Sequence, residues 1–316
     1  MSNKRMEDSK SFKKIAMKFG GYQLRYAWVS QRGFYPEEPN KANQDSHVEV
    51  ENFCSEQGVE DMHLFGVFDG HGKTGDLCAQ WARDHVPVEL AACLKAYPDD
   101  IERCFKESFV KVNNTLHESN VDDRMSGTTA IVVLVYKGTI HVANVGDSRA
   151  IIAQQQDSHL KAYSLSQDQT PFRKDERERC KRAGAQIATM DQLEGLEPMH
   201  ENWGDTAETG GEEGDGDPPR VWIPNQMSPG CAFTRSIGDQ VGESVGVFAE
   251  VHMPPAGAPQ GHVVAATPWP RLPLSTSSAP PPAPAPPRAP SRSCSTSSSL
   301  PATSSSSSHR TVCGSS

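Results

Sequence analysis

Four aspartates at turns are the residues of this chain whose type and setting could do chemistry. Each lies beside a glycine or at the end of an expected strand, where a side chain can project into a cleft. Hard oxygen ligands in such places suit Mg²⁺ or Mn²⁺. Taken singly, each is better explained as an ordinary turn residue. Taken together, they predict a metal-dependent active site, and they are Asp45, Asp69, Asp147 and Asp239.

Two other patterns match known motifs but lack the context that those motifs need, and a third motif fails at a required residue. Residues 70–75 read G-x-G-x-x-G, but a helix and Pro87 follow where a dinucleotide fold requires a second strand that ends in an acid. A P-loop fails because Val67 stands where glycine is required. Residues 242–246 read G-x-S-x-G, but two prolines follow where a nucleophile elbow requires a helix. We therefore expect neither a nucleotide site nor a serine hydrolase.

The elements that must position the aspartates follow from the spacing of apolar residues. Apolar runs predict strands at 22–30 and 62–68, and three more within 129–153, with a hairpin turn at Lys137-Gly138. Helical spacing predicts helices at 73–86 and from Ile101 to Leu116, the second capped by Asp99 or Asp100. A charged helix is expected at 172–183. This order of strands, helices and further strands favours an α+β sandwich over regular βαβ alternation.

Charge and composition divide the chain into three parts. Residues 1–250 carry 27 Lys and Arg against 40 Asp and Glu, whereas residues 251–316 hold 16 Ser, 14 Pro, four Arg and no acid. We expect a polar basic tail at 1–21, a folded domain at 22–250 and a disordered Pro/Ser-rich tail at 251–316. The acidic body argues against nucleic-acid binding, and no apolar run is long enough for a membrane span. We expect a monomer.

The eight cysteines are scattered, and no C-x-x-C pair occurs among them. The N-terminus has no apolar core of the kind that a secretory signal needs. We therefore expect reduced thiols in a cytoplasmic or nuclear protein, and no zinc site.

Six blocks in a fixed order carry a resemblance to a known family. They are KANQDSH (41–47), FGVFDGHG (65–72), SGTTAIVVLV (126–135), VANVGDSRAII (142–152), LSQDQTPFRKDERERCKRAGAQI (165–187) and FTRSIGD (233–239). From about residue 22 to 250 the chain resembles the type-2C metal-dependent protein serine/threonine phosphatases, closest to plant and algal members. The resemblance implies an αββα sandwich of two antiparallel sheets flanked by helices, incomplete at the C-terminus.

The resemblance also implies a mechanism and its residues. Two Mg²⁺ or Mn²⁺ ions would share a bridging hydroxide that attacks the phosphorus of phosphoserine or phosphothreonine. Asp69 is the implied bridging ligand, with the carbonyl of Gly70 facing a metal, Asp45 a metal or metal-water ligand, and Asp147 the holder of a weaker metal. His71 is the implied general acid. Phosphoprotein substrates follow, and with them a role in signalling.

The chain departs from the family pattern in two places. Asn40 stands where family members often carry a phosphate-binding Arg, so Lys41 or Arg32 would have to substitute. The family's core also continues with two further aspartate ligands, whereas this sequence has no Asp after Asp239. Changes to residues behind a metal's ligands already cost about 10–100-fold in affinity or activity, so two missing ligands should cost more. The alternative function is a catalytically impaired binding protein, with the Pro-rich tail docking an aromatic groove.

Overall fold

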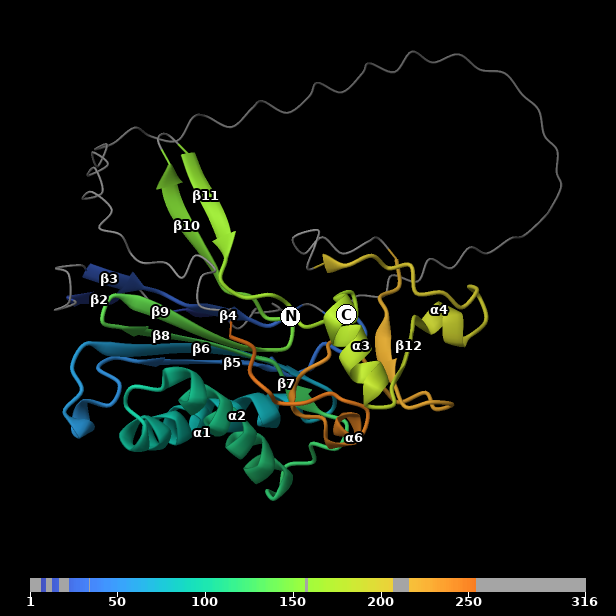
Figure 1. Ribbon diagram of the computed structural model, residues 1–316, viewed down its shortest axis with the longest axis horizontal. Helices are drawn as coiled ribbons and strands as arrows, with labels where there is room; N and C mark the ends of the chain where they lie inside the picture. The colour runs from blue at the N-terminus through green and yellow to red at the C-terminus, as the bar shows by residue number, and fades with distance from the viewer. Residues whose placement is uncertain are drawn as a thin grey trace, which may run out of the picture. The chain divides into compact units, whose positions relative to one another are not determined.

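The computed structural model describes residues 7–9, 13–16, 23–33, 35–156, 159–206 and 216–253. Its centre is an antiparallel sheet (Figure 1), in which β6 (Met62–His71) lies between β5 (Asp45–Val50) and β8 (Ala130–Tyr136), and β8 pairs with β9 (Thr139–Val145). The short strands β7 (Gly127–Thr128) and β15 (Ile237–Gly238) continue the pairing at the end of β6. Strand β6 pairs antiparallel with β5, β7 and β8, whereas the strand before the glycine motif of a dinucleotide fold has parallel neighbours.

The hairpin between β8 and β9 confirms the turn that the sequence predicts. Lys137 and Gly138 have φ values of 50° and 75°. Positive φ at both central residues is the type I′ geometry that matches the twist of two paired strands. The turn fixes the register of β9 against β8. Asp147 follows β9 and therefore lies at the end of the sheet.

Two helices cover one face of the sheet (Figure 1): α1 (Gly75–Ala96) and α2 (Ile101–His117). Their buried side chains form one core with those of β6 and β8, which includes Leu64, Phe68, Phe105, Phe109 and Leu134. Helix α1 runs ten residues beyond the predicted end, straight through Pro87. An interior proline costs about 3 kcal/mol. Burial of Leu90 and Leu94 beyond the proline offsets that cost.

The opposite face of the sheet carries small two-stranded pieces, two of them hairpins. They are β1 (Glu7–Ser9) with β4 (Val29–Gln31), β2 (Lys13–Ala16) with β3 (Gln23–Tyr26), and β10 (Ile151–Gln156) with β11 (His159–Ser164). Two short strands lie within the expected tail, at residues 7–9 and 13–16, where the backbone pairs with β4 and β3. The expected bounds of the tail stay a prediction. The rings of Tyr26 and of Phe65 in the sheet pack edge to face, with their centroids 5.2 Å apart.

An open apolar groove of about 500 Å³ remains on this face, between the hairpins and the sheet. Its walls include Leu24, Tyr26, Phe65, Val133, Ile140 and Ile152. In the described part of the chain, the second layer is therefore made of separate two-stranded pieces rather than one continuous sheet. The α+β class is confirmed, with helices on one face of the central sheet.

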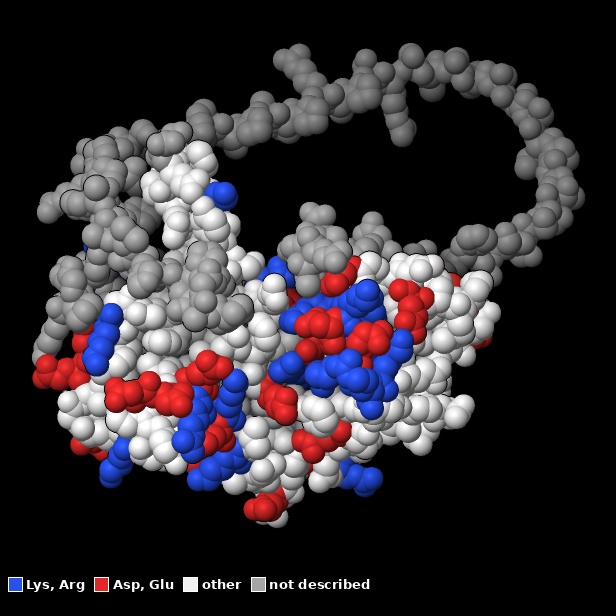
Figure 2. All heavy atoms as spheres, in the orientation of Figure 1, with Lys and Arg blue, Asp and Glu red and all other residues white. Residues whose placement is uncertain are grey.

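A smaller unit packs beside the end of the sheet. It holds α3 (Lys174–Arg182), α4 (Met190–Leu193), α6 (Gln240–Glu243) and a sheet of β12 (Gln186–Ala188), β13 (Arg220–Trp222) and β14 (Pro229–Cys231). Figure 2 shows acidic and basic side chains crowded together over α3. The short 3-10 helix η1 (Ser55–Gln57) lies between β5 and β6. Residues 251–253 are also ordered, with His252 bridging to Asn144, so the fold extends slightly past Glu250.

Within the described ranges, no helix combines the length and the hydropathy that a transmembrane span requires. The six described cysteines are free thiols.

A partly buried histidine at the end of α2 should make the stability of the fold fall at alkaline pH. His117 Nδ1 lies 2.5 Å from Asp123 Oδ2, and Nε2 lies 3.1 Å from Glu243 Oε1. These two hydrogen bonds raise the pKa of His117 to about 9. Because the folded pKa lies above the unfolded value of about 6.5, the contribution is complete below that pH and is lost as pH rises through 9.

We therefore expect the urea midpoint of the protein to fall between pH 6.5 and 9.5. In His117→Gln the fall should be smaller, because the variant cannot carry the charge. Equal falls in both proteins would show that His117 does not titrate as described.

Candidate functional site

Two of the predicted site residues lie side by side at one end of the sheet. Asp45 opens β5 and Asp69 lies near the end of β6, and the register makes their Cα positions direct partners. The backbone of Asp69 is fixed from the other side by Thr129, whose Oγ1 accepts the N–H of Asp69 at 3.1 Å. Thr129 N–H donates in return to the Asp69 carbonyl at 2.9 Å. The two carboxylates therefore project from neighbouring positions of a rigid edge.

The third carboxylate, Asp147, follows β9 on the same edge. Thr129 Oγ1 lies 2.6 Å from the hydroxyl of Ser148, which ties the turn after β9 to the strand that holds Asp69. Arg149 forms a bidentate pair with Asp168 at 2.9 and 2.7 Å. Asp147 itself points to solvent.

The pKa of Asp69 reflects its surroundings, including the charges of the other two carboxylates. Although the side chain of Asp69 reaches solvent, the protein around its carboxyl removes part of its hydration. That loss, the negative charges of Asp45 and Asp147, and a hydrogen bond with Asp45 raise the pKa of Asp69 to about 6, against a smaller lowering by His71. Like charges held together in this way favour a proton or a bound cation.

His71 ends β6 and is held by an aspartate from far along the chain. Its Nε2 lies 2.5 Å from Oδ2 of Asp239, whose side chain is only 3% exposed. The ring of His71 also packs 4.4 Å from that of Phe233. Asp239 has φ of 49°, a left-handed conformation at the start of α6 that turns its carboxyl back toward β6. The imidazole is therefore fixed on two sides.

Gly70 is where the backbone passes closest to its neighbours. A Cβ at this position would meet the carbonyl of Gly75 and would lie 2.7 Å from the carbonyl oxygen of Gln44. Gln44 also fixes the turn through its Nε2, which donates to the Gly72 carbonyl at 2.7 Å. Only glycine fits there.

The two cations expected to bind phosphate have other contacts in the structure. Arg32 donates to the carbonyls of Pro39 and Lys41, the second at 3.1 Å, and so braces the loop before β5. Lys41 lies 4.1 Å above the ring of Tyr35. Their role toward phosphate stays a prediction.

The contact between His71 and Asp239 is what the sequence reasoning missed. Asp239 was grouped with the turn aspartates, but nothing in a single sequence pairs two residues 168 positions apart. The FTRSIGD block itself was the available signal, since it marks the segment as part of the site.

The carboxylates of the site do not form a complete set of metal ligands in their present positions. Among the described residues, no group of three Asp, Glu, His or Cys side chains is arranged so that it could hold a metal ion as the side chains stand. The carboxylates of Asp45, Asp69 and Asp147 influence one another, but they do not close around a common point.

Two solved structures resemble the chain at a distance. One, titled as the structure of a C. elegans sex determining protein, is 18% identical with a TM-score of 0.49 and covers 67% of this chain and 44% of its own. The other is a serine-threonine phosphatase 2C from Toxoplasma gondii, which is 17% identical with a TM-score of 0.48. The match covers 68% of this chain and 69% of the Toxoplasma chain.

Sequence relatives are much closer. Probable protein phosphatase 2C 35 of Arabidopsis thaliana is 45% identical over 255 residues, which cover 79% of this chain and 71% of the relative. Probable protein phosphatase 2C 72 of the same plant is 29% identical, and the match covers 58% of that protein's length. The family model described as Protein phosphatase 2C matches residues 37–266, beyond the expected end of the resemblance at 250. The chain belongs to the protein phosphatase 2C family.

Proposed function

We propose that this chain is a metal-dependent protein phosphatase that hydrolyses phosphoserine and phosphothreonine in protein substrates. The observation that supports it best is the placement of Asp69, the register partner of Asp45, on the strand that ends at a histidine held by Asp239. Loss of hydration, followed by the charges of Asp45 and Asp147, raises the pKa of Asp69 to about 6. Family membership supplies the reaction class, because the relatives are named as protein phosphatases.

The donor chemistry of the site fits Mg²⁺ or Mn²⁺, which prefer carboxylate and carbonyl oxygens. Asp45, Asp69 and Asp147, with the carbonyl of Gly70, would hold the ions. Bound divalent ions acidify a coordinated water and offset the charge of a phosphoryl group. Among the described residues, however, no three such side chains are arranged around one metal position. Affinity should therefore be weak.

His71 is the residue placed to move a proton. Its Nε2 is engaged by Asp239, so Nδ1 is the nitrogen that can give a proton to the departing seryl or threonyl oxygen. Asp239 fixes the ring orientation and the tautomer, as a buried carboxylate does for a catalytic imidazole. The ring of Phe233 limits rotation on the other side.

A cysteine nucleophile is not supported by the described thiols. Burial raises the pKa of Cys78 to about 12 and of Cys180 to about 11. Burial raises the pKa values of the other four described cysteines as well. None of the six is therefore a thiolate at neutral pH.

The alternative is a phosphatase fold that binds phosphoproteins without turnover. Two observations favour it: the described carboxylates do not form a three-ligand group, and no acidic residue follows Glu250 in the sequence. Binding would then use the same edge of the sheet.

The test is hydrolysis of a phosphothreonine peptide by the purified full chain, with Mn²⁺ titrated into the assay. Asp69→Asn serves as the control for contaminating phosphatases. Turnover that needs Mn²⁺ and disappears in the variant supports the phosphatase. A folded protein that binds the peptide but leaves it intact, with or without Mn²⁺, contradicts it and supports the binding protein.

A further inference from the structure

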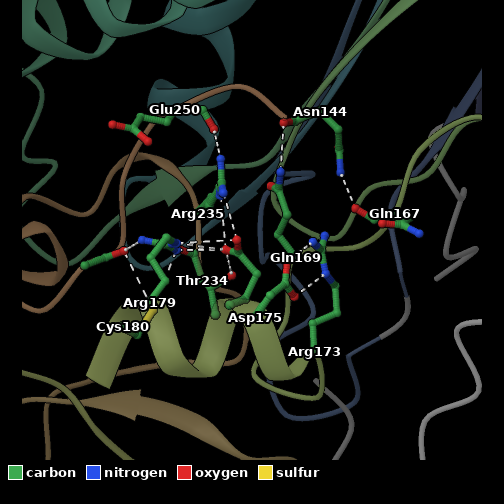
Figure 3. Close-up of polar contacts among 12 residues, drawn as sticks. Asn144, Gln167, Gln169, Arg173, Asp175, Arg179, Cys180, Thr234, Arg235 and Glu250 are labelled. Atoms are coloured by element: carbon green, nitrogen blue, oxygen red, sulfur yellow. Dashed lines mark hydrogen bonds and ion pairs between the residues drawn. The ribbon is translucent and has the colours of Figure 1, made fainter. Parts of the chain in front are cut away.

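Gln169 is a fully buried glutamine that contacts two separate turns of the site (Figure 3). Its Oε1 accepts the N–H of Gly146 at 2.6 Å, and its Nε2 donates to the carbonyl of Asn144 at 3.1 Å. Its own N–H donates to the Gly146 carbonyl at 3.0 Å. Its carbonyl accepts the N–H of Thr234 at 2.8 Å. All four of its hydrogen-bonding groups are therefore used, and they reach two segments of the chain.

The first segment presents Asp147. Gly146 immediately precedes it with φ of 98°, a conformation that needs glycine. Asn144 Nδ2 adds bonds to the carbonyls of Gly146 and Gln167, at 3.1 and 3.2 Å. With the amide of Gln169, these bonds fix the direction in which the chain leaves β9.

The second segment presents Asp239. Thr234 is fully buried, and its hydroxyl donates to Glu176 at 2.7 Å, so the residue that Gln169 contacts is itself rigid. Five residues later, Asp239 bonds His71. Strand β15 between them pairs with β7, so a shift at Thr234 is passed along a short, hydrogen-bonded stretch.

We propose that Gln169 is a positioning residue that sets the Asp147 turn and the Asp239–His71 pair in register with each other. The chemistry explains the residue type, because a glutamine amide offers one acceptor and one donor to the N–H and C=O of the same turn. A methionine has similar length and flexibility but neither group. As a statement about catalysis, the proposal rests on the proposed function; as a statement about coupling between the two segments, it stands without it.

Amide hydrogen exchange on the full chain tests the coupling without an activity assay. The variants are Gln169→Met and the shorter Gln169→Asn. The matched control is Gln192→Met, because Gln192 is also buried and also bonds backbone, at Pro198 and His200, but lies in α4 away from the site. We expect at least about 10-fold faster exchange in both 142–149 and 233–239 for the Gln169 variants. For the control, we expect faster exchange only near 189–201.

Turnover tests the catalytic part. If the wild-type chain is active, the kcat of the Gln169 variants should be about 10–100-fold lower, with a smaller change in KM. This range is typical of substitutions at residues that hydrogen-bond and orient metal ligands. Faster exchange confined to one of the two segments overturns the coupling, as does failure of both variants to fold while the control folds. Unchanged kcat with faster exchange in both segments overturns only the catalytic part. An inactive wild-type chain counts against the proposed function and leaves the exchange result to decide the coupling.

Discussion

Replacing Glu176 with alanine is expected to lower the free energy of unfolding by about 3–5 kcal/mol, the cost of breaking a buried ion pair from one side. The carboxylate is 2% exposed and pairs with two arginines, Arg179 and Arg235, which Figure 3 labels. Arg235 binds it at 2.7 and 3.0 Å and Arg179 at 2.8 Å, and the hydroxyl of Thr234 adds a bond at 2.7 Å. Alanine would leave both guanidinium groups without their main partner.

The two arginines also contact residues 246–250. Arg179 Nη1 donates to the carbonyl of Gly246 at 2.6 Å, and Arg235 Nη1 donates to that of Glu250 at 2.7 Å. Glu176 therefore connects α3, through these arginines, both to the segment before Asp239 and to residues 246–250. Its loss should loosen both of these attachments.

Urea unfolding of Glu176→Ala and Glu178→Ala measures the difference. Glu178 is on the same helix, but 45% of its side chain is exposed and its contact with Lys181 is 3.4 Å long. An exposed pair of this kind is worth about 0–1 kcal/mol. Similar losses in the two variants would mean that the buried network adds nothing.

The same network predicts sensitivity to acid. Burial alone would raise the pKa of Glu176, but the hydrogen bonds and charges of Arg235 and Arg179 outweigh it and hold that pKa far below its usual range. Because the pKa of Glu176 is lower in the folded state, its ionised form stabilises the protein above the unfolded pKa of about 4.3. This stabilisation is lost progressively as pH falls below that value. The loss of stability in acid should be smaller in Glu176→Ala than in the wild type.

Features that depend on neighbouring residues could be predicted from the sequence. The side chain of Asp100 accepts the N–H of Arg103 at 3.1 Å, so one of the two proposed caps of α2 is correct. The Lys137-Gly138 turn likewise follows from local residue types. Both are set within four residues, where backbone preferences decide the outcome.

Features that depend on distant partners could not be predicted. All residues of α3 except Cys180 are charged, which indicates a solvated helix, yet Glu176 and Arg177 are buried. Arg235, 59 positions away, neutralises Glu176 together with the neighbouring Arg179, and backbone carbonyls accept the hydrogen bonds of Arg177. The same limit applies to Asp239 and His71. In the site, the resemblance named Asp45, Asp69 and Asp147, but tertiary packing decides how closely they gather.

Replacing Gly127 with alanine is the substitution expected to damage the site most through shape alone. Gly127 lies in β7, where a Cβ would fall onto Oδ2 of Asp239 and within 2.6 Å of Ser236 Oγ. It would also lie 2.7 Å from the Ile237 carbonyl, which belongs to the paired strand β15 and cannot move cheaply. Asp239 must therefore shift, and its bond to His71 is lost.

A misplacement of about 1 Å at a catalytic group can cost about 100-fold in rate, and overpacking a core typically costs about 1–3 kcal/mol. We expect Gly127→Ala to fold with kcat reduced by about 100-fold at saturating Mn²⁺. We expect the proton of the short hydrogen bond between His71 Nε2 and Asp239 Oδ2, 2.5 Å apart, to give a downfield NMR signal in the wild type. The signal should disappear in the variant, with or without turnover. Gly33→Ala is the control, because its nearest obstacle is the side-chain ring of Tyr35 at 3.1 Å. If the signal survived in a folded Gly127→Ala protein, the contact between Gly127 and Asp239 would not be what fixes His71.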